Sequence, residues 1–374
     1  MRLPIVDTFT ASSSPATAPG FDTGPRSISA VRVLRMSVTD RCNYRCVYCM
    51  PEEGVRWLPK DEILSYEEIA DVVKAAVELH GIRRFKLTGG EPTVRSGLTD
   101  LVRRLRAIAG VEDLSLTTNG QRLLDLAQPL YESGLDRITV SLDSLQDVKF
   151  RRITRTGDLA TVLAGLDRAE AVGFKSLKIN CVTMRGTNDD ELADFARLSL
   201  IRRLTVRFIE YMPLGDAALM HVAERKVADQ EIGPAGGCGA QDRGDDALIP
   251  ESEVRDAIER ELGPLAPIER DSEPGVGPAK VYQLVRGNPL GRIGFISAMS
   301  APFCSTCNRL RLTADGVLRS CLFEGGEVDL KPILRESRLS SRAAGVAQAM
   351  TDCVRLKPDV HSRHGNQQMS RIGG

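Results

Sequence analysis

The sequence lacks an excess of either charge, because 50 lysines and arginines balance 50 aspartates and glutamates in 374 residues. Without net charge, no overall field draws the protein to nucleic acid or to an acidic membrane, and any anion site must be built from local charges. No apolar run approaches the roughly 20 residues that cross a bilayer. We therefore expect neither a nucleic acid nor a membrane as a partner.

The first 29 residues lack the continuous apolar core of a secretory signal and are rich in Ser, Thr, Pro, Ala and Gly. This composition is typical of a disordered tail. An organelle transit peptide is the alternative, and Asp7, Asp22 and the shortage of arginine argue against it. With no export signal, the nine cysteines indicate a reducing compartment, and we expect a cytoplasmic protein.

Histidine is scarce, and none of the four histidines is near either of two cysteine groups. The groups are Cys42, Cys46 and Cys49, spaced C-x3-C-x2-C, and Cys304, Cys307 and Cys321, spaced C-x2-C-x13-C. A structural zinc site needs four nitrogen or sulfur ligands, which neither group supplies locally. Three thiolates suit a cubane iron–sulfur cluster with one iron left for a non-protein ligand. For the second group, a zinc knuckle that borrows a ligand such as Cys353 stays open.

Strand and helix patterns alternate between residues 31 and 210. The expected strands are 31–38, 82–90, 113–118, 136–142, 175–183 and 202–210, and the expected helices are 65–81, 97–109, 121–133, 158–172 and 189–199. Ser65 and Glu68 form a capping box, and Gly81 suits the helix end. Alternation implies right-handed parallel crossovers. We therefore predict an α/β fold with a partial (βα)6 TIM-like barrel, whose chemistry lies at the C-terminal ends of the strands.

The pattern changes after residue 212. Residues 233–246 are Gly-rich and polar and predict a loop, and a helix is expected at 251–262. Two strand pairs follow, 279–285 with 291–297 and a hairpin within 308–322, whose Asp315-Gly316 turn returns Cys321 toward Cys304 and Cys307. Residues 331–355 read as helical. The predicted regions are a tail (1–29), the barrel (30–212), a smaller α+β region that closes it (213–330), and a helical segment with a Gly-Gly tail (331–374).

Several motifs together resemble one family. The segment "SVTDRCNYRCVYCMP" is similar to the radical S-adenosylmethionine (SAM) signature. With "LTGGEP", "LTTNG", "VSLD", "FIEYMPLG", "CNRLRLTADG", the second cysteine group and the terminal Gly-Gly, the chain resembles the GTP 3′,8-cyclases, the molybdenum-cofactor biosynthesis A family. The first cysteine group alone would specify only the superfamily. The resemblance covers about residues 30–374.

The resemblance also implies cofactors and site residues. It implies two 4Fe–4S clusters, one on each cysteine group, with SAM on the first and the guanine of GTP on the second. The implied SAM contacts are Tyr48, Gly90, Ser141 and Met212, and the implied GTP contacts are Arg35, Lys86, Thr117, Lys178, Arg309, Leu310 and Arg311. Arg35, Arg309, Arg311, Gly373 and Gly374 would act in catalysis. Lys86 departs from the arginine usual in the family, and an ammonium is a point donor, not a planar fork.

The implied reaction is the first step of molybdenum cofactor biosynthesis. A 5′-deoxyadenosyl radical takes the 3′ hydrogen of GTP, and attack on guanine C8 gives (8S)-3′,8-cyclo-7,8-dihydro-GTP. An electron donor, a downstream cyclic pyranopterin monophosphate synthase and a homodimer are further expectations. One alternative is a radical SAM peptide maturase with an auxiliary cluster, against which the basic residues and the tail argue. The other is a zinc-stabilised binding module without catalysis, which the iron content would distinguish.

Overall fold

The computed structural model describes residues 24–174, 176–214, 247–269, 277–324, 326–361 and residue 372. The predictions made for residues 1–23, 233–246 and Gly373-Gly374 lie outside this part of the chain. Residues 24–29, the end of the predicted tail, belong to the ordered fold. Arg26 Nε donates to Lys357 O (2.8 Å), and Ser27 caps the short 3-10 helix η1 (Ile28–Ala30).

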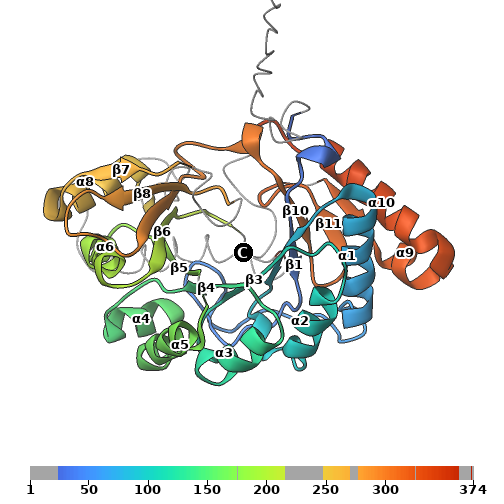
Figure 1. Ribbon diagram of the computed structural model, residues 1–374, viewed down its shortest axis with the longest axis horizontal. Helices are drawn as coiled ribbons and strands as arrows, with labels where there is room; N and C mark the ends of the chain where they lie inside the picture. The colour runs from blue at the N-terminus through green and yellow to red at the C-terminus, as the bar shows by residue number, and fades with distance from the viewer. Residues whose placement is uncertain are drawn as a thin grey trace, which may run out of the picture.

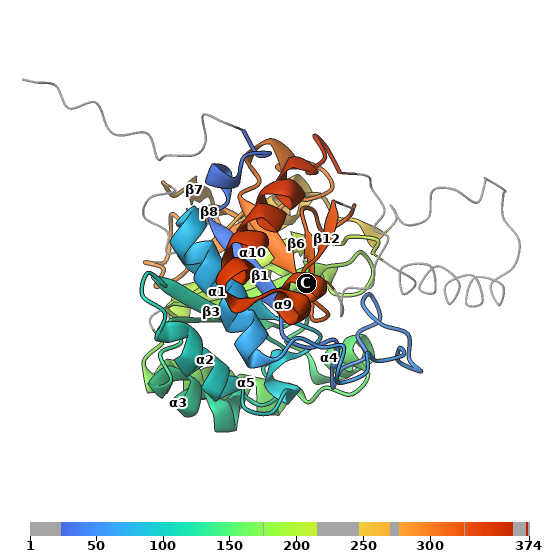
Figure 2. The same ribbon diagram turned by 90° about the vertical axis from the view of Figure 1, so that its right-hand side faces the viewer.

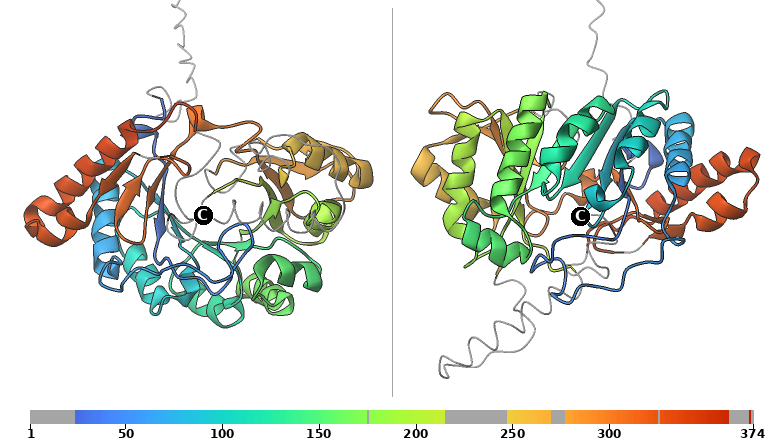
Figure 3. Two further views of the ribbon diagram at one scale, coloured as in Figure 1. Left: turned by 180° about the vertical axis from the view of Figure 1, so that it is seen from behind. Right: turned by 90° about the horizontal axis from the view of Figure 1, so that it is seen from below.

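The six predicted strands lie side by side, in chain order and all parallel. They are β1 (Val33–Ser37), β2 (Arg84–Thr88), β3 (Asp113–Thr118), β4 (Arg137–Ser141), β5 (Leu177–Thr183) and β6 (Leu204–Glu210). The helices that connect them are α1 (Tyr66–His80), α2 (Leu98–Arg106), α3 (Leu123–Glu132), α4 (Asp147–Thr154), α5 (Leu159–Val172) and α6 (Leu192–Ile201). The predicted (βα)6 unit is confirmed, with α4 as a helix that the sequence did not predict. The strands form the inside of an arc and the helices its outside (Figure 1; Figure 3).

The C-terminal strands extend the same sheet at both edges. β9 (Arg292–Ile296) pairs parallel with β6, and β8 (Lys280–Leu284) and β7 (Leu265–Pro267) follow it. At the other edge, β10 (Arg309–Leu312) pairs parallel with β1, and β11 (Val317–Arg319) and β12 (Glu327–Asp329) follow. The sheet thus has twelve strands. Both predicted strand pairs are present, but they continue the barrel sheet and do not form a separate layer.

Three helices complete the described part of the C-terminal region. α8 (Glu251–Leu262) has the predicted bounds. The helix predicted at 331–355 is divided into α9 (Lys331–Glu336) and α10 (Leu339–Arg355). α10 packs beside α1, and His80 Nε2 makes a 2.8 Å hydrogen bond with Ala347 O (Figure 2). Within the described residues, no helix is both long and apolar enough to cross a membrane.

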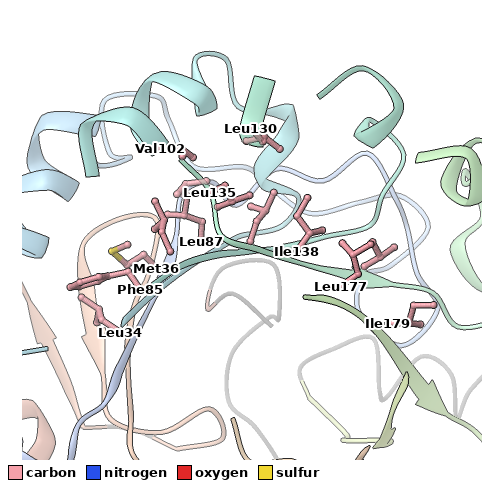
Figure 4. Packing of buried hydrophobic residues seen from close by; sticks show 14 of the residues in the cluster. Leu34, Met36, Phe85, Leu87, Val102, Leu130, Leu135, Ile138, Leu177 and Ile179 are labelled. Atoms are coloured by element: carbon pink, nitrogen blue, oxygen red, sulfur yellow. The ribbon is translucent and has the colours of Figure 1, made fainter. Parts of the chain in front are cut away.

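Alternation along the strands gives the sheet two different faces. The outer face is apolar and is buried beneath the helices, as Leu34, Met36, Phe85, Leu87 and Ile138 show in Figure 4. The residues between them point to the inside of the arc, and many are polar or basic. Burying a polar or charged side chain away from water costs free energy unless it has a hydrogen-bond or ionic partner. A buried inner face rich in such side chains therefore indicates a binding site.

The predicted capping box of α1 is present. Ser65 Oγ accepts from Glu68 N (3.1 Å), and Glu68 Oε2 accepts from Ser65 N (2.7 Å). We expect Ser65→Ala to lower the free energy of unfolding by about 1 kcal/mol, because Glu68 N–H loses the hydroxyl oxygen that accepts its hydrogen bond. Urea unfolding followed by circular dichroism measures it. Ser65→Asp, which keeps a capping oxygen, is the control, and an unchanged midpoint in Ser65→Ala would contradict the expectation.

Candidate active site

One cavity of about 360 Å³ lies inside the arc of strands. Both cysteine groups line it. The other predicted contacts that line it are Arg35, Tyr48, Lys86, Gly90, Thr117, Ser141, Lys178, Met212, Arg309 and Arg311. Leu310 differs, because its buried side chain lies on the apolar outer face of the sheet. Leu310 therefore offers only its backbone to a ligand in the cavity.

The two cysteine groups lie at opposite ends of two neighbouring strands. Cys42, Cys46 and Cys49 follow the C-terminal end of β1, whereas Cys304 and Cys307 precede the N-terminal end of β10. Because β1 and β10 are parallel and pair Val33 with Arg309, the groups are separated by about one strand length. Five residues at roughly 3.3 Å each make that length about 16.5 Å. The antiparallel β11 returns the chain, so that Cys321 joins Cys304 and Cys307 as predicted.

The first cysteine group is held in a compact loop. Cys49 N and Met50 N both donate to Cys46 O (2.9 and 3.0 Å), and Tyr44 N donates to Cys42 Sγ (3.3 Å). All three thiols are free of disulfides. Burial raises the pKa of Cys42 to about 11 and that of Cys49 to about 12. A metal that binds here as a thiolate complex must therefore displace protons.

The glycine pair after β2 packs directly against this loop. A Cβ at Gly90 would lie 2.4 Å from Arg41 O and 2.5 Å from Asp40 O, and one at Gly89 would lie 2.6 Å from Thr39 O. Backbone atoms cannot retreat as a flexible side chain would. The sequence predicted that Gly90 admits a ligand closely, and the structure adds that the cysteine loop itself requires a residue without a side chain here.

Glu91 lies in the "GGEP" motif but was not predicted as a site residue. Its buried carboxylate accepts from Thr118 Oγ1 and Asn119 N (both 2.6 Å) and from Thr93 N (3.0 Å). The carboxylate thus joins the end of β3 to the loop after β2. Glu91 fixes the relative position of two strand ends beside the cysteine loop.

Asp143, in the "VSLD" motif, was also missed. Its Oδ2 accepts from Tyr48 Oη and its Oδ1 from Val182 N, each at 2.8 Å. Burial raises the pKa of Asp143 to about 6. The carboxylate orients the ring of Tyr48 at the wall of the cavity, beside Ser141 at the end of β4.

Basic side chains form the middle of the cavity wall. Arg35 pairs in register with Lys86 on one side and with Arg311 on the other, so all three point to the inside of the arc. Burial and the charges of Arg311, Arg309 and Arg207 lower the pKa of Arg35 well below its ordinary value. Like charges at close range repel, and an anionic ligand would relieve that repulsion. The charge and geometry of this arrangement suit an anionic ligand.

Arg207 belongs to the same group and was not predicted. It is buried on the inner face of β6, and its guanidinium donates to Thr139 Oγ1 (3.3 Å), to which Lys86 Nζ also donates (3.4 Å). Alternation along "TVRFIE" was the signal that could have revealed it. Thr117 Oγ1 is buried in this region without a hydrogen-bond partner in the described residues, and a ligand group would satisfy it.

The second cysteine group lies in a more positive environment than the first. Burial raises the pKa of Cys307, but the charges of Arg309 and Lys357 outweigh it, so that the net shift is downward. His361 also lines the cavity: it stacks on Phe323 with ring centroids 4.0 Å apart, and its Nε2 bonds to Ala298 O (2.8 Å). His361 reaches this position because the chain after α10 returns to the cavity.

The zinc alternative for the second group finds no support in this geometry. Cys353, the suggested fourth ligand, is buried outside the cavity lining, and its thiol donates to Gly326 O (3.0 Å). Across the described ranges, no three His, Cys, Asp or Glu side chains are arranged to hold a single metal ion. A cubane cluster places its thiolate ligands on different irons and so needs wider spacing than one ion does. Triplets of thiols on compact loops fit that larger group.

Comparison with known proteins gives two family matches. Residues 36–199 match the Radical SAM superfamily, and residues 230–363 match Molybdenum Cofactor Synthesis C. The solved structure of SuiB from Streptococcus suis covers 78% of this chain and 60% of that chain, with 14% identity and a TM-score of 0.45, which is too distant to indicate an activity.

Three curated relatives, each named GTP 3′,8-cyclase, are similar over almost the whole chain. The protein of Pelotomaculum thermopropionicum is 45% identical over 92% of this chain and 98% of its own length. That of Thermodesulfovibrio yellowstonii is 41% identical, with coverages of 91% and 97%, and that of Pseudomonas putida is 42% identical, with coverages of 88% and 89%. The chain therefore belongs to the GTP 3′,8-cyclase family of the radical SAM superfamily.

Proposed function

We propose that the protein converts GTP to (8S)-3′,8-cyclo-7,8-dihydro-GTP in the first step of molybdenum cofactor biosynthesis. The observation that carries the proposal is that both cysteine triplets line one cavity. One triplet follows the C-terminal end of β1, the other lies at the N-terminal end of β10, and buried cations lie between them. Membership of the superfamily implies SAM and one 4Fe–4S cluster. Bound together, they would supply a 5′-deoxyadenosyl radical for removal of the 3′ hydrogen of the substrate. The protein's own residues place that hydrogen and exclude water.

The end of the cavity near the first triplet suits SAM. Cys42, Cys46 and Cys49 are proposed to hold the first cluster. Tyr48, Gly90, Ser141 and Met212 would contact SAM around it, since all four line the cavity. The hydrogen bond from Tyr48 Oη to Asp143 Oδ2 orients the ring of Tyr48 before SAM binds. A ring fixed before binding loses less entropy when SAM arrives.

The other end suits GTP and a second cluster, which we propose on Cys304, Cys307 and Cys321 as a dock for guanine. Arg35, Arg309 and Arg311 would act on the substrate directly, with Lys86, Lys178 and Thr117 completing the phosphate and hydroxyl contacts. Arg309 and Arg311 alternate on β10 and share one face, and guanidinium groups suit bidentate phosphate binding. A triphosphate would bring negative charge next to these basic groups.

The terminal Gly373 and Gly374 are proposed to complete the catalytic site. Both lie outside the described residues, but the adjacent Ile372 is only 2% exposed. The burial of Ile372, the last residue that the structure describes, supports this proposal.

Further partners follow from the chemistry and stay predictions. A reduced cluster requires an electron donor, and the cyclised product requires a downstream cyclic pyranopterin monophosphate synthase. The cytoplasmic location and the homodimer are likewise expectations from the sequence alone.

Anaerobic incubation of the full chain with GTP, SAM and a reductant tests the proposed function. Mass spectrometry should find cyclised dihydro-GTP and 5′-deoxyadenosine in about equal amounts. Formation of 5′-deoxyadenosine only with a peptide, and never with GTP, would favour the maturase alternative. Purified protein that contains stoichiometric zinc and no labile sulfide would favour the alternative of a zinc-stabilised binding module without catalysis.

Lys86→Met is expected to raise the KM for GTP roughly ten- to a hundredfold, because one hydrogen bond to a charged group contributes about 1.5–3 kcal/mol. Lys86→Arg keeps the charge and should have a KM near that of the parent. Cleavage of SAM without GTP should be the same in all three proteins. Steady-state assays with varied GTP measure this, and an unchanged KM in Lys86→Met would remove Lys86 from the phosphate site.

A further inference from the structure

Lys357, just beyond the end of α10, is a buried cation that the proposed reaction does not use. Its side chain is only 4% exposed and does not line the cavity, so it is not a substrate contact. Its Nζ donates to Cys307 O (2.9 Å), and its carbonyl accepts from Arg26 Nε (2.8 Å). The lysine is thus fixed directly behind a cysteine of the second group.

A buried ammonium is very unfavourable without a negative partner. In the part of the chain that the structure describes, no carboxylate forms an ion pair with Lys357. The acidic groups nearby are paired with other cations: Asp359 with Arg26, Asp352 with Arg355, and Glu327 with Arg319. A single carbonyl satisfies one of the three N–H groups and none of the charge.

The bond from Lys357 Nζ to Cys307 O places the ammonium next to a residue that would become a thiolate ligand when the second triplet holds a cluster. Burial lowers the pKa of Lys357, and the charges of Cys307, Cys321 and Cys353 oppose that shift. The cations around it, Arg309 among them, only add repulsion. A cubane bound by three thiolates carries net negative charge, and its reduction potential depends on nearby charges and on solvent exposure.

We propose that Lys357 is the buried counter-charge of the second 4Fe–4S cluster and raises the reduction potential of that cluster. This inference rests on the proposed function, because it needs the second cluster. Lys357 acts as a positioning residue through its bond to Cys307 O and through its field, without touching the substrate. One-electron reduction adds a negative charge to the cluster, which a fixed positive charge favours most when water is excluded.

The test compares Lys357→Met and Lys357→Arg in full-length protein that also carries Cys42→Ala, Cys46→Ala and Cys49→Ala. In this background only the second cluster is expected, so a potentiometric titration followed by electron paramagnetic resonance measures its midpoint directly. Lys357→Met keeps the length of the side chain and removes the charge. Lys74→Met, which removes an ammonium that is 61% exposed on α1, is the matched control.

With about four irons in each protein, Lys357→Met should move the midpoint to a more negative value, whereas Lys357→Arg and Lys74→Met should leave it near that of the background. Iron-free Lys357→Met should be at least as stable to heat, because a buried unpaired charge has been replaced by an apolar group. Loss of the second cluster in Lys357→Met but not in Lys357→Arg would also support a charge role.

An unchanged midpoint in Lys357→Met would overturn the inference, and so would an equal shift or equal cluster loss in Lys357→Arg, which would indicate packing and not charge. A background protein that binds no iron would instead refute the second cluster. The failure of the inference and the failure of the proposed function are therefore distinguishable.

Discussion

Replacing Cys42, Cys46 and Cys49 together with alanine is expected to reduce the iron content from about eight to about four per chain and to bring SAM cleavage down to background. The three thiols belong to one compact loop after β1, whereas Cys181 and Cys353 belong to the hydrophobic core and the other triplet lies at the start of β10. Without thiolates the loop offers only backbone and alanine methyl groups to iron. SAM would then have no metal to bind and no source of the electron that its cleavage requires.

Iron and sulfide analysis, together with 5′-deoxyadenosine measured under anaerobic conditions with a reductant, checks this expectation. Cys181→Ala is the matched control, because Cys181 is a buried cysteine of β5 that belongs to the hydrophobic core. Its replacement should leave both the iron content and SAM cleavage near the parent values. SAM cleavage that persists in the triple variant would refute the assignment of the first cluster to this loop.

The loss of activity should occur without loss of the fold. The cysteine loop is held by Gly89 and Gly90 against Thr39, Asp40 and Arg41, and by backbone hydrogen bonds that do not involve the thiols. Alanine fits all three positions. The circular dichroism spectrum of the iron-free variant should therefore match that of the iron-free parent.

The order and type of the barrel elements could be predicted from the sequence because local patterns determine them. The Ser65 capping box and the apolar spacing of α1 are contained within one stretch of chain, and the same holds for β1 to β6. The choice of partners for β9 and β10 is different. The segments "GRIGFIS" and "RLRL" contain no local pattern that predicts their partners. β9 pairs with β6 and β10 pairs with β1, at opposite edges of the six-stranded unit.

The candidate site shows the same division. Cysteines at short spacing and glycines after a strand are visible in the sequence. Glu91, Asp143 and Arg207 are ordinary charged residues until the fold buries them, and their roles depend on partners that are 27 to 95 positions distant, such as Thr118 and Tyr48. α4 was missed because its segment "DVKFRRIT" is short and polar and has no side-chain cap.

Replacing Cys304, Cys307 and Cys321 with alanine is expected to have the complementary effect. About four irons should remain, SAM should still be cleaved in an uncoupled reaction, and cyclisation of GTP should fall to background. The separation of the triplets by about one strand length is the physical reason, since a change at the start of β10 leaves the loop after β1 intact. The basic residues would still attract the triphosphate, so GTP should bind. Its guanine would not be held in one position, because the second cluster is absent.

Placement decides the outcome, because a radical removes a hydrogen only when the reacting atoms lie within about 3–3.5 Å and are aligned. A nucleotide held by its phosphates alone samples many positions of the ribose, and the radical is then lost to other reactions. Product analysis by mass spectrometry and a 5′-deoxyadenosine assay, run on the same samples, separate cleavage from cyclisation. The Cys353→Ala variant is the control, because that thiol bonds to Gly326 O and lies outside the cavity lining. Cyclisation that survives without the second triplet would show that Arg35, Arg309 and Arg311 position GTP by themselves, and the proposed docking of guanine would be wrong.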